Sequence, residues 1–381
     1  MRIIEKISSR RDLLISIIIF LLVGIIILLA NQTPIEKIMT RKGIYYEKAV
    51  VTEVISSNLE IDEESEALTG IQEIKAEIKS GELKGETFII RNNANYMFNV
   101  VCEKGTKLIV SIEESGGERQ AYVYTYDRTG ALYGFIAVFC LVLIGIGGKK
   151  GVKSLLSLIF TFVCIIFLFI PLLYHGVSPI IASIILSIVS TFAAMVFIGG
   201  WNAKTISSII GTIFCTSFAG ATSMIAGHFL KISDFTMESV DDVLVIARLS
   251  NLNTKGILFA IILISSLGAI MDVCMSIASS INEVYMTNPK ISQKDLFKSG
   301  INVGRDTMGT MSNTLILAFA GGFMINLIII ASRDITLYEL LSMPSIVTEI
   351  IQGLAGSIGI FLAVPIVSLV SSWLTVNKKL L

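Results

Sequence analysis

Long apolar runs alternate with short polar connections along most of the chain, and only residues 32–130 break this pattern. A run of about 20 apolar residues, at about 1.5 Å per residue, crosses a hydrocarbon core about 30 Å thick. About eight runs meet this requirement and predict membrane-spanning helices. They lie at residues 13–30, 131–147, 155–174, 180–199, 205–230, 256–281, 308–331 and 346–375.

Residues 32–130 contain short runs with strand character in place of a long apolar run. Turn-rich stretches such as SGELKG and EESGG separate these runs. Five strands are predicted, at residues 49–56, 72–79, 86–91, 108–114 and 120–126. Five short strands in a segment of this size favour a small closed barrel, of which an OB-like barrel is the best match.

These two patterns divide the chain into three parts. Residues 1–31 hold an N-terminal tail and the first helix, residues 32–130 a β domain, and residues 131–381 a seven-helix membrane domain. The predicted fold class is therefore an α-helical polytopic membrane protein with a small all-β domain between helices 1 and 2. The first run also resembles a cleavable signal, but the following NQTPIEKIM lacks a small-x-small cleavage pattern, so a retained helix is expected.

Basic residues fall in alternate connections between the predicted helices, and this asymmetry predicts an orientation. They are Arg2, Lys6, Arg10, Arg11, Lys149, Lys150, Lys153, Lys204, Lys290, Lys294, Lys298, Arg305, Lys378 and Lys379. By the positive-inside rule both termini are cytoplasmic and residues 32–130 are extracytoplasmic, in a multi-pass protein of the cell membrane. Residues 235–249 combine apolar and acidic positions at helical spacing, which predicts an amphipathic helix on the outer membrane face.

Composition agrees with the membrane interpretation and narrows the chemistry. Hydrophobic residues make up 53% of the chain and charged residues 16%, with a mean hydropathy of +0.77. The β domain is mildly acidic, so nucleic acid is not an expected partner. Cys102 is the one cysteine outside the apolar runs, and no Cys or His cluster has metal-ligand spacing. No disulfide, metal or other cofactor is predicted, and the absence of G-x-S-x-G, HExxH and phosphate-loop motifs disfavours an enzyme.

Asp272 is the main candidate for function, because an ionisable side chain deep in an apolar helix is costly and usually functional. Ser265, Gly268, Ser276 and Ser279 follow at spacings of three and four and share its helix face. The structural alternative is that Asp272 forms hydrogen bonds to neighbouring helices and so fixes their register.

Other candidates flank this position in neighbouring helices. Thr310 and Asn313 recur with Asp306 on one face of the seventh helix, and Asn313 lies at the same predicted depth as Asp272. Thr212 and Thr216 occupy a comparable depth in the fifth helix, so an ion or substrate site between the last four helices is expected. The secondary site candidates are Asp306, Arg305, Gly268 and Glu349. The simpler explanation is an interfacial ion pair for Arg305 and Asp306 at the cytoplasmic boundary, and a solvated carboxylate near the outer start of the eighth helix for Glu349.

The stretches GAIMDVCMSIASSINEV, KSGINVGRDTMGTMSNTLILAFAGG and GLAGSIGIFLAVPIV resemble the YibE/F family of bacterial multispanning membrane proteins. The resemblance covers nearly the whole chain and implies a membrane protein with an extracytoplasmic domain, without naming a substrate. A weaker likeness joins Gly268, Asp272 and the following basic loop to the resistance-nodulation-division superfamily, including SecD and SecF. It implies that Asp272 carries a proton and that Asn313 is its partner, although that superfamily has six helices per half and larger soluble domains.

Two functions of different classes remain open from the sequence. The first is a proton- or cation-coupled transporter of unknown substrate, with Asp272 binding the ion. The second is a non-enzymatic scaffold or assembly factor that docks an extracytoplasmic protein partner through its β domain. Besides the lipid bilayer, a proton or cation and a second copy of the chain are the candidate partners.

Overall fold

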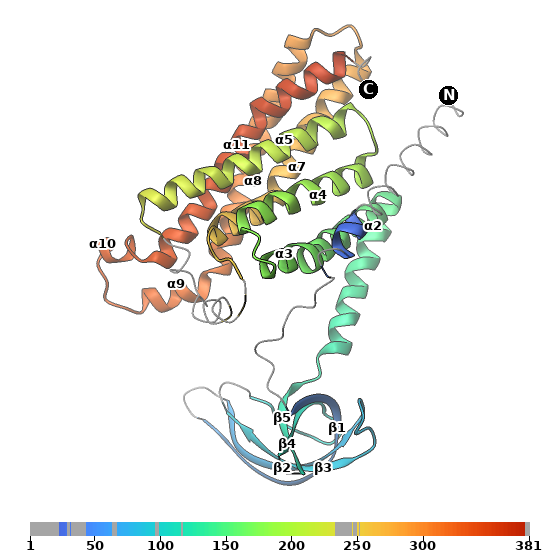
Figure 1. Cartoon of the computed structure of the whole chain (residues 1–381), viewed down its shortest axis with the longest axis vertical. Coiled ribbons are helices and arrows are strands. Elements are labelled where there is room, and N and C mark those ends of the chain that lie inside the picture. The colour runs from blue at the N-terminus through green and yellow to red at the C-terminus, as the bar shows by residue number, and fades with distance from the viewer. Residues whose placement is uncertain are drawn as a thin grey trace. The chain divides into compact units, whose positions relative to one another are not determined.

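The computed structural model describes residues 23–28, 31, 43–62, 67–95, 99–115, 117–232, 246, 250 and 252–377 (Figure 1). Most of the predicted first helix and nearly all of the predicted amphipathic helix at 235–249 lie outside these residues; 23–28 are helical. The chain forms two compact units, one of Met39–Val142 and one of Met1–Ile38 with Leu143–Leu381.

The smaller unit contains five antiparallel strands: β1 (Ile44–Ile61), β2 (Leu68–Ile78), β3 (Thr87–Ala94), β4 (Lys107–Ser115) and β5 (Glu118–Tyr126). The strand order is β3-β2-β1-β4-β5. β3 and β5, at the two ends of this order, contact each other, so the sheet curls into a nearly closed barrel. β1 pairs with β2 and β4, and two irregularities in its register with β2 accommodate this curvature. The predicted five-stranded barrel is therefore confirmed.

Alternate side chains fill the barrel interior, as the period of a strand requires. Ile74, Ile90, Leu108 and Ile112 are fully buried there. Cys102 packs in the same core, and burial raises the pKa of its thiol to about 11. The thiol therefore stays protonated at neutral pH and is a poor nucleophile.

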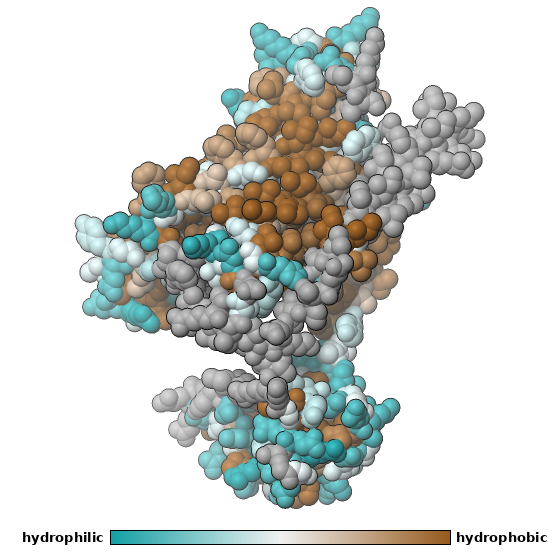
Figure 2. Space-filling view, in the orientation of Figure 1, coloured by the Kyte–Doolittle hydropathy of each residue, from teal (hydrophilic) through white to brown (hydrophobic). Residues whose placement is uncertain are grey.

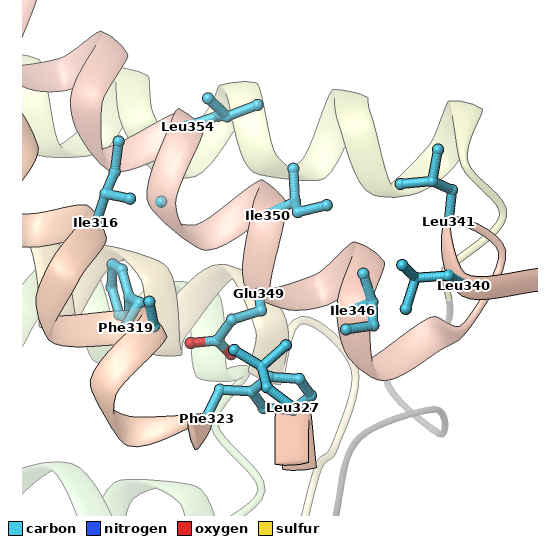
Figure 3. Close-up of a pocket in the computed structure, with 12 residues that line it drawn as sticks. Ile316, Phe319, Phe323, Leu327, Leu340, Leu341, Ile346, Glu349, Ile350 and Leu354 are labelled. Atoms are coloured by element: carbon cyan, nitrogen blue, oxygen red, sulfur yellow. The ribbon is translucent and has the colours of Figure 1, made fainter. Parts of the chain in front are cut away.

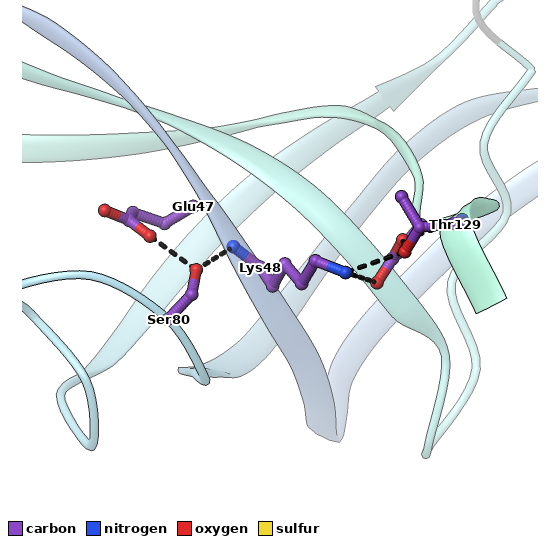
Figure 4. A network of polar contacts seen from close by, with 5 residues as sticks. Glu47, Lys48, Ser80 and Thr129 are labelled. Carbon is purple, nitrogen blue, oxygen red and sulfur yellow. Dashed lines mark hydrogen bonds and ion pairs between the residues drawn. The ribbon is translucent and has the colours of Figure 1, made fainter. Parts of the chain in front are cut away.

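A polar network joins β1 to the start of the helix α2 (Thr129–Cys164) within the smaller unit (Figure 4). Lys48 Nζ donates to Thr129 Oγ1 at 2.7 Å and lies 3.2 Å from Asp127 Oδ2. Hydrogen bonds from the hydroxyl and backbone N–H of Thr129, together with Lys48, hold the pKa of Asp127 below its ordinary range. The Lys48 backbone N–H donates to Ser80 Oγ, whose hydroxyl donates in turn to Glu47.

The remaining elements are helical: η1 (Ile165–Phe169), α3 (Ile170–Tyr174), α4 (Pro179–Gly199), α5 (Ala203–Phe229), α7 (Ile257–Thr287), α8 (Gln293–Gly322), α9 (Met324–Ala331), α10 (Leu337–Leu340) and α11 (Pro344–Val376). Among the described residues, five helical stretches are long and apolar enough to cross a membrane, or six if the bent pair α8–α9 is one span. Figure 2 shows hydrophobic side chains over much of the visible face of this unit. The fold is that of a helical polytopic membrane protein with an N-terminal β domain.

Two features account for the difference between these five or six spans and the predicted number of about eight: most of the first predicted helix lies outside the described residues, and two other predicted segments are counted as one. Residues 129–174 form one stretch of 46 residues by helical assignment, but Gly148 breaks it with φ 51° and ψ −131°. The chain bends sharply at this break. A Cβ on Gly151 would lie 2.2 Å from the carbonyl oxygen of Leu143, eight residues earlier, whereas eight residues of a straight helix span about 12 Å. This stretch therefore contains both predicted segments, 131–147 and 155–174, joined by a turn that only glycine adopts readily.

The core of the larger unit lies where α5, α7, α8 and α11 meet. Small residues permit this close packing: a Cβ on Gly211 would lie 2.3 Å from Val367, and one on Gly304 would lie 2.4 Å from Val364. Ile270 and Ile277 of α7 are fully buried in this core. α4 contacts α5 and α7.

Candidate functional site

Asp272 lies on a polar stripe of α7 that faces away from the apolar core. Ser265, Gly268, Asp272 and Ser276 are all exposed, and Ser279 is half-buried. Val273, Cys274 and Ile277 alternate with these positions around the helix and are fully buried. The predicted periodicity is therefore present, and it separates a polar face from an apolar face on one helix. We call residues 265, 268, 272, 276 and 279 the α7 stripe.

The two edges of the α7 stripe pack against different neighbours. Met271 and Met275, on one side, belong to the hydrophobic cluster that includes α4. Ala269, on the other side, packs against the cluster that includes Leu315 of α8. The stripe consequently lies between two hydrophobic clusters of the helical unit.

Within the described part of the chain, the Asp272 carboxylate forms no hydrogen bond and no ion pair. It also does not bond to Asn313, the partner suggested by equal depth. The described residues thus supply no basic side chain that neutralises this carboxylate, which leaves it open to a proton, a cation or water.

α8 carries a second polar face. Asp306, Thr310 and Asn313 are exposed, and the Thr310 hydroxyl donates to the Asp306 carbonyl oxygen at 3.2 Å. The buried face of α8 holds Gly304 and Ser312 and packs on α11, so the polar face lies on the other side of the helix.

The expected ion pair between Arg305 and Asp306 does not form, although both residues are described. Both side chains are exposed. Consecutive residues of an α-helix point about 100° apart, so neighbours in sequence do not face each other.

The fifth-helix threonines lie elsewhere. Thr212 and Thr216 are fully buried, and the Thr216 hydroxyl donates to the Thr212 carbonyl oxygen at 2.8 Å and lies 3.3 Å from Ser187 Oγ of α4. Thr212 lies beside the Cys274 thiol. Cys274 is two residues from Asp272, which on a helix is about 200° around the axis. Thr212 therefore packs on the face of α7 opposite to Asp272, and the two residues do not share one site.

Buried hydroxyl groups on α11 were not among the candidates predicted from the sequence. Ser368, Ser371 and Thr375 are fully buried at helical spacings, and among the described residues their hydroxyls have no hydrogen-bond partner. By contrast, Ser312 of α8 donates to Ser357 of α11 at 2.7 Å. The signal was present in the sequence as Ser/Thr at one helix face, but such a pattern more often serves packing.

Glu349 does not occupy the solvated position expected for it. It is half-buried and lines a pocket whose other lining residues are apolar, between α8, α9, α10 and α11 (Figure 3). Its carboxylate points toward Phe319 and Phe323. No residue of the α7 stripe lines this pocket, so Glu349 does not share a site with Asp272.

Comparison with known protein families gives two matches along the chain. The model described as YibE/F-like protein matches residues 135–377, and the model described as YibE/F family N-terminal domain matches residues 44–126. The comparisons with curated proteins and with solved structures found no match. The two family matches together cover most of both units.

Proposed function

The chain belongs to the YibE/F family, and from this premise we propose that it is a proton- or cation-coupled membrane transporter in which Asp272 binds the ion. The observation that supports the proposal is the α7 stripe, which keeps a carboxylate within a membrane-length helix, off the apolar core and without a basic partner among the described residues.

The energetics favour an ionic role over packing. Placing an aspartate at the centre of a membrane helix costs about 2.5–3.5 kcal/mol on insertion scales. A packing role recovers this cost through hydrogen bonds to neighbouring helices, and Asp272 makes none within the described chain. Binding a proton neutralises the carboxylate directly, and binding a cation compensates its charge.

The neighbouring polar groups fit this role as accessories. Ser276 is one helical turn from Asp272 on the same stripe, and Thr310 and Asn313 provide a hydroxyl and an amide on α8. These groups can hydrogen-bond water that carries the ion to and from Asp272. We therefore assign these groups to a path of water molecules that leads to Asp272. No catalytic role is assigned to them, since the proposed function is not enzymatic.

The orientation is part of the same proposal. By the positive-inside rule, Lys149, Lys150 and Lys153, near the break at Gly148, lie in the cytoplasm, as do both termini. The β domain is then extracytoplasmic, and the ion moves across the cell membrane through the helical unit.

Proton flux in liposomes tests the proposal. The purified full chain is reconstituted, a pH gradient is imposed, and flux is compared between the wild type and Asp272→Asn. The matched control is Asp334→Asn, which removes an exposed carboxylate between α9 and α10. We expect flux from the wild type and the control and background flux from Asp272→Asn. Equal flux from all three proteins, or none from the wild type, would contradict the proposal.

A docking role for the β domain is the second candidate, and a tyrosine cluster on the barrel favours it. Tyr46, Tyr122 and Tyr124 are exposed on the outer face of β1 and β5, and the rings of Tyr46 and Tyr124 meet edge to face with centroids 5.0 Å apart. Exposed tyrosines are enriched in protein interfaces. Under this hypothesis Tyr46→Ala with Tyr124→Ala abolishes function as completely as deletion of residues 46–128, while Asp272→Asn is silent.

A further inference from the structure

We propose that an anionic phospholipid binds in a groove between α5, α8 and α11, with an acyl chain on the apolar lining and the headgroup beside Lys290 and Lys294. No residue of the α7 stripe lines this groove, and the proposal does not depend on ion coupling at Asp272. Three observations support it: the lining of the groove, its place at the ends of three helices, and the charge of the chain beside it.

The groove has a volume of about 450 Å³ and, apart from one glutamine, an apolar lining. The lining residues are Ile210 of α5, Gln293 of α8, and Leu369, Val370, Trp373 and Leu374 of α11. Ile210, Leu369 and Trp373 are about half exposed, so the groove is open along one side. Lipid chains are as apolar as these side chains, and a chain of the surrounding bilayer fits this surface without loss of polar contacts.

The groove lies where three helices have their ends. α5 begins at Ala203, α8 begins at Gln293 and α11 ends at Val376. The lining brings Ile210, Gln293 and Trp373 together near these ends. Tryptophan is enriched at the boundary between lipid chains and headgroups, because its ring is apolar and its N–H is polar. An acyl chain in the groove therefore places its headgroup near the start of α8.

The segment that leads into α8 supplies positive charge. Lys290 lies three residues before Gln293 and Lys294 directly follows it, and both lysines are exposed. Neither forms an ion pair within the described part of the chain. The nearby carboxylate of Asp295 accepts a hydrogen bond from the Ser292 hydroxyl at 2.7 Å. The two ammonium groups are therefore available to a phosphate.

Charge selects the class of lipid. Lysine side chains lie along apolar surface and hold their ammonium groups at the level of the headgroups. A zwitterionic headgroup brings its own cation to the same place, whereas a net anionic headgroup does not. Each lysine near an anionic membrane surface contributes about a fivefold preference.

Trp373 reports directly on occupancy of the groove. The chain has two tryptophans, so Trp201→Phe leaves Trp373 as the one remaining, and bromine atoms on an acyl chain quench a tryptophan that they contact. The full chain with Trp201→Phe is reconstituted in phosphatidylcholine vesicles that hold the same small fraction of brominated phosphatidylglycerol or brominated phosphatidylcholine. We expect phosphatidylglycerol to bind about fivefold more tightly or better, and high salt to remove most of this preference.

Two lysine variants locate the headgroup. Lys290→Gln with Lys294→Gln is expected to make the two lipids bind equally. The matched control is Lys149→Gln with Lys150→Gln, which removes two exposed lysines next to the break at Gly148. The control is expected to keep the preference, because these lysines adjoin no residue of the groove lining.

Gln293→Glu is a second route that does not disturb folding. It places a carboxylate in the groove lining at nearly constant shape, and an acidic residue in the first turn of a helix is stabilising. We expect this variant to lose the preference for the anionic lipid. Asn202→Asp adds a carboxylate at the N-cap of α5, outside the lining, and is expected to bind both lipids as the parent chain does.

Several results would overturn the proposal. They are equal quenching by the two lipids in the parent chain, a preference that survives in the folded lysine variant or in Gln293→Glu, and an equal loss in the Lys149 and Lys150 control. Quenching of Trp373 by neither lipid would show that a protein surface, such as a second copy of the chain, covers the groove. Loss of the preference on addition of inorganic phosphate at constant ionic strength would assign the lysines to free phosphate.

Discussion

The two units of the protein treat buried polar groups differently. In the barrel, Gln72 and Asn92 are almost fully buried and fully engaged: Gln72 accepts from the Cys102 N–H at 2.8 Å, and Asn92 donates to the Val100 carbonyl oxygen at 2.6 Å. In the helical unit, the hydroxyls of Ser368 and Ser371 are equally buried and have no partner among the described residues.

This difference in hydrogen bonding indicates different roles for the two interiors. Satisfied polar networks fix a single arrangement and leave nothing for a ligand. Unsatisfied buried groups in a native structure call for an explanation such as water or an ion. The barrel is therefore a fixed module, and the helical unit holds unused hydrogen-bonding capacity both on the α7 stripe and inside α11.

The largest expected effect is in the barrel. Gln72→Ala removes both bonds between this side chain and the Cys102 backbone and leaves a buried N–H without its acceptor. The expected loss is about 1–3 kcal/mol of barrel stability. Hydrogen–deuterium exchange of the full chain should show faster exchange in β2 and at Cys102, with the helices unchanged. Unaltered protection of β2 and of the Cys102 amide would show that this network does not hold the barrel interior.

An acid-induced loosening at the start of α2 is the intermediate effect. Because the folded pKa of Asp127 is lowered, its bonds to Thr129 and Lys48 stabilise the fold above the unfolded pKa of about 3.9 and are lost as pH falls below it. Exchange of amides 128–135, corrected for intrinsic rate, should rise below about pH 4. Asp127→Asn should show that raised exchange already at neutral pH; a pH-independent wild type would refute the role of this pair.

The smallest expected effect is in the helical unit. Ser371→Ala removes a hydroxyl that has no partner within the described residues, so the melting temperature should stay the same or rise, corresponding to less than about 0.5 kcal/mol of destabilisation. The control is Leu374→Ala in the same helix, which removes a buried side chain and should lower the melting temperature. A loss from Ser371→Ala as large as that of the control would mean that this hydroxyl is satisfied.

Much of the architecture could be predicted from the sequence because it depends on local periodicity. Alternation of apolar and polar residues predicted the strands, and the length of the apolar runs predicted the helices. The α7 stripe was also predicted, since residues 265, 268, 272, 276 and 279 fall on one face by helix geometry alone. The long apolar helices agree with the membrane interpretation, and the two family matches confirm the family.

The arrangement around the stripe could not be predicted, because it depends on which helices become neighbours. Depth placed Thr212 beside Asp272, but the structure places Thr212 on the other side of α7. The bend at Phe323 was missed since Gly321 and Gly322 sit in a continuous apolar run. That bend turns Glu349 from an expected surface carboxylate into part of a pocket.

The central claim is that Asp272 exchanges a proton or cation with water, and infrared titration tests it most directly. The carboxyl stretch of protonated Asp272 is isolated as the difference between the wild type and Asp272→Asn in lipid, recorded as bulk pH is cycled. We predict a band that appears on acidification and disappears reversibly on return to alkaline pH. A carboxyl that keeps one protonation state at every pH, with no response to added monovalent cations, would contradict the account and make Asp272 a structural residue.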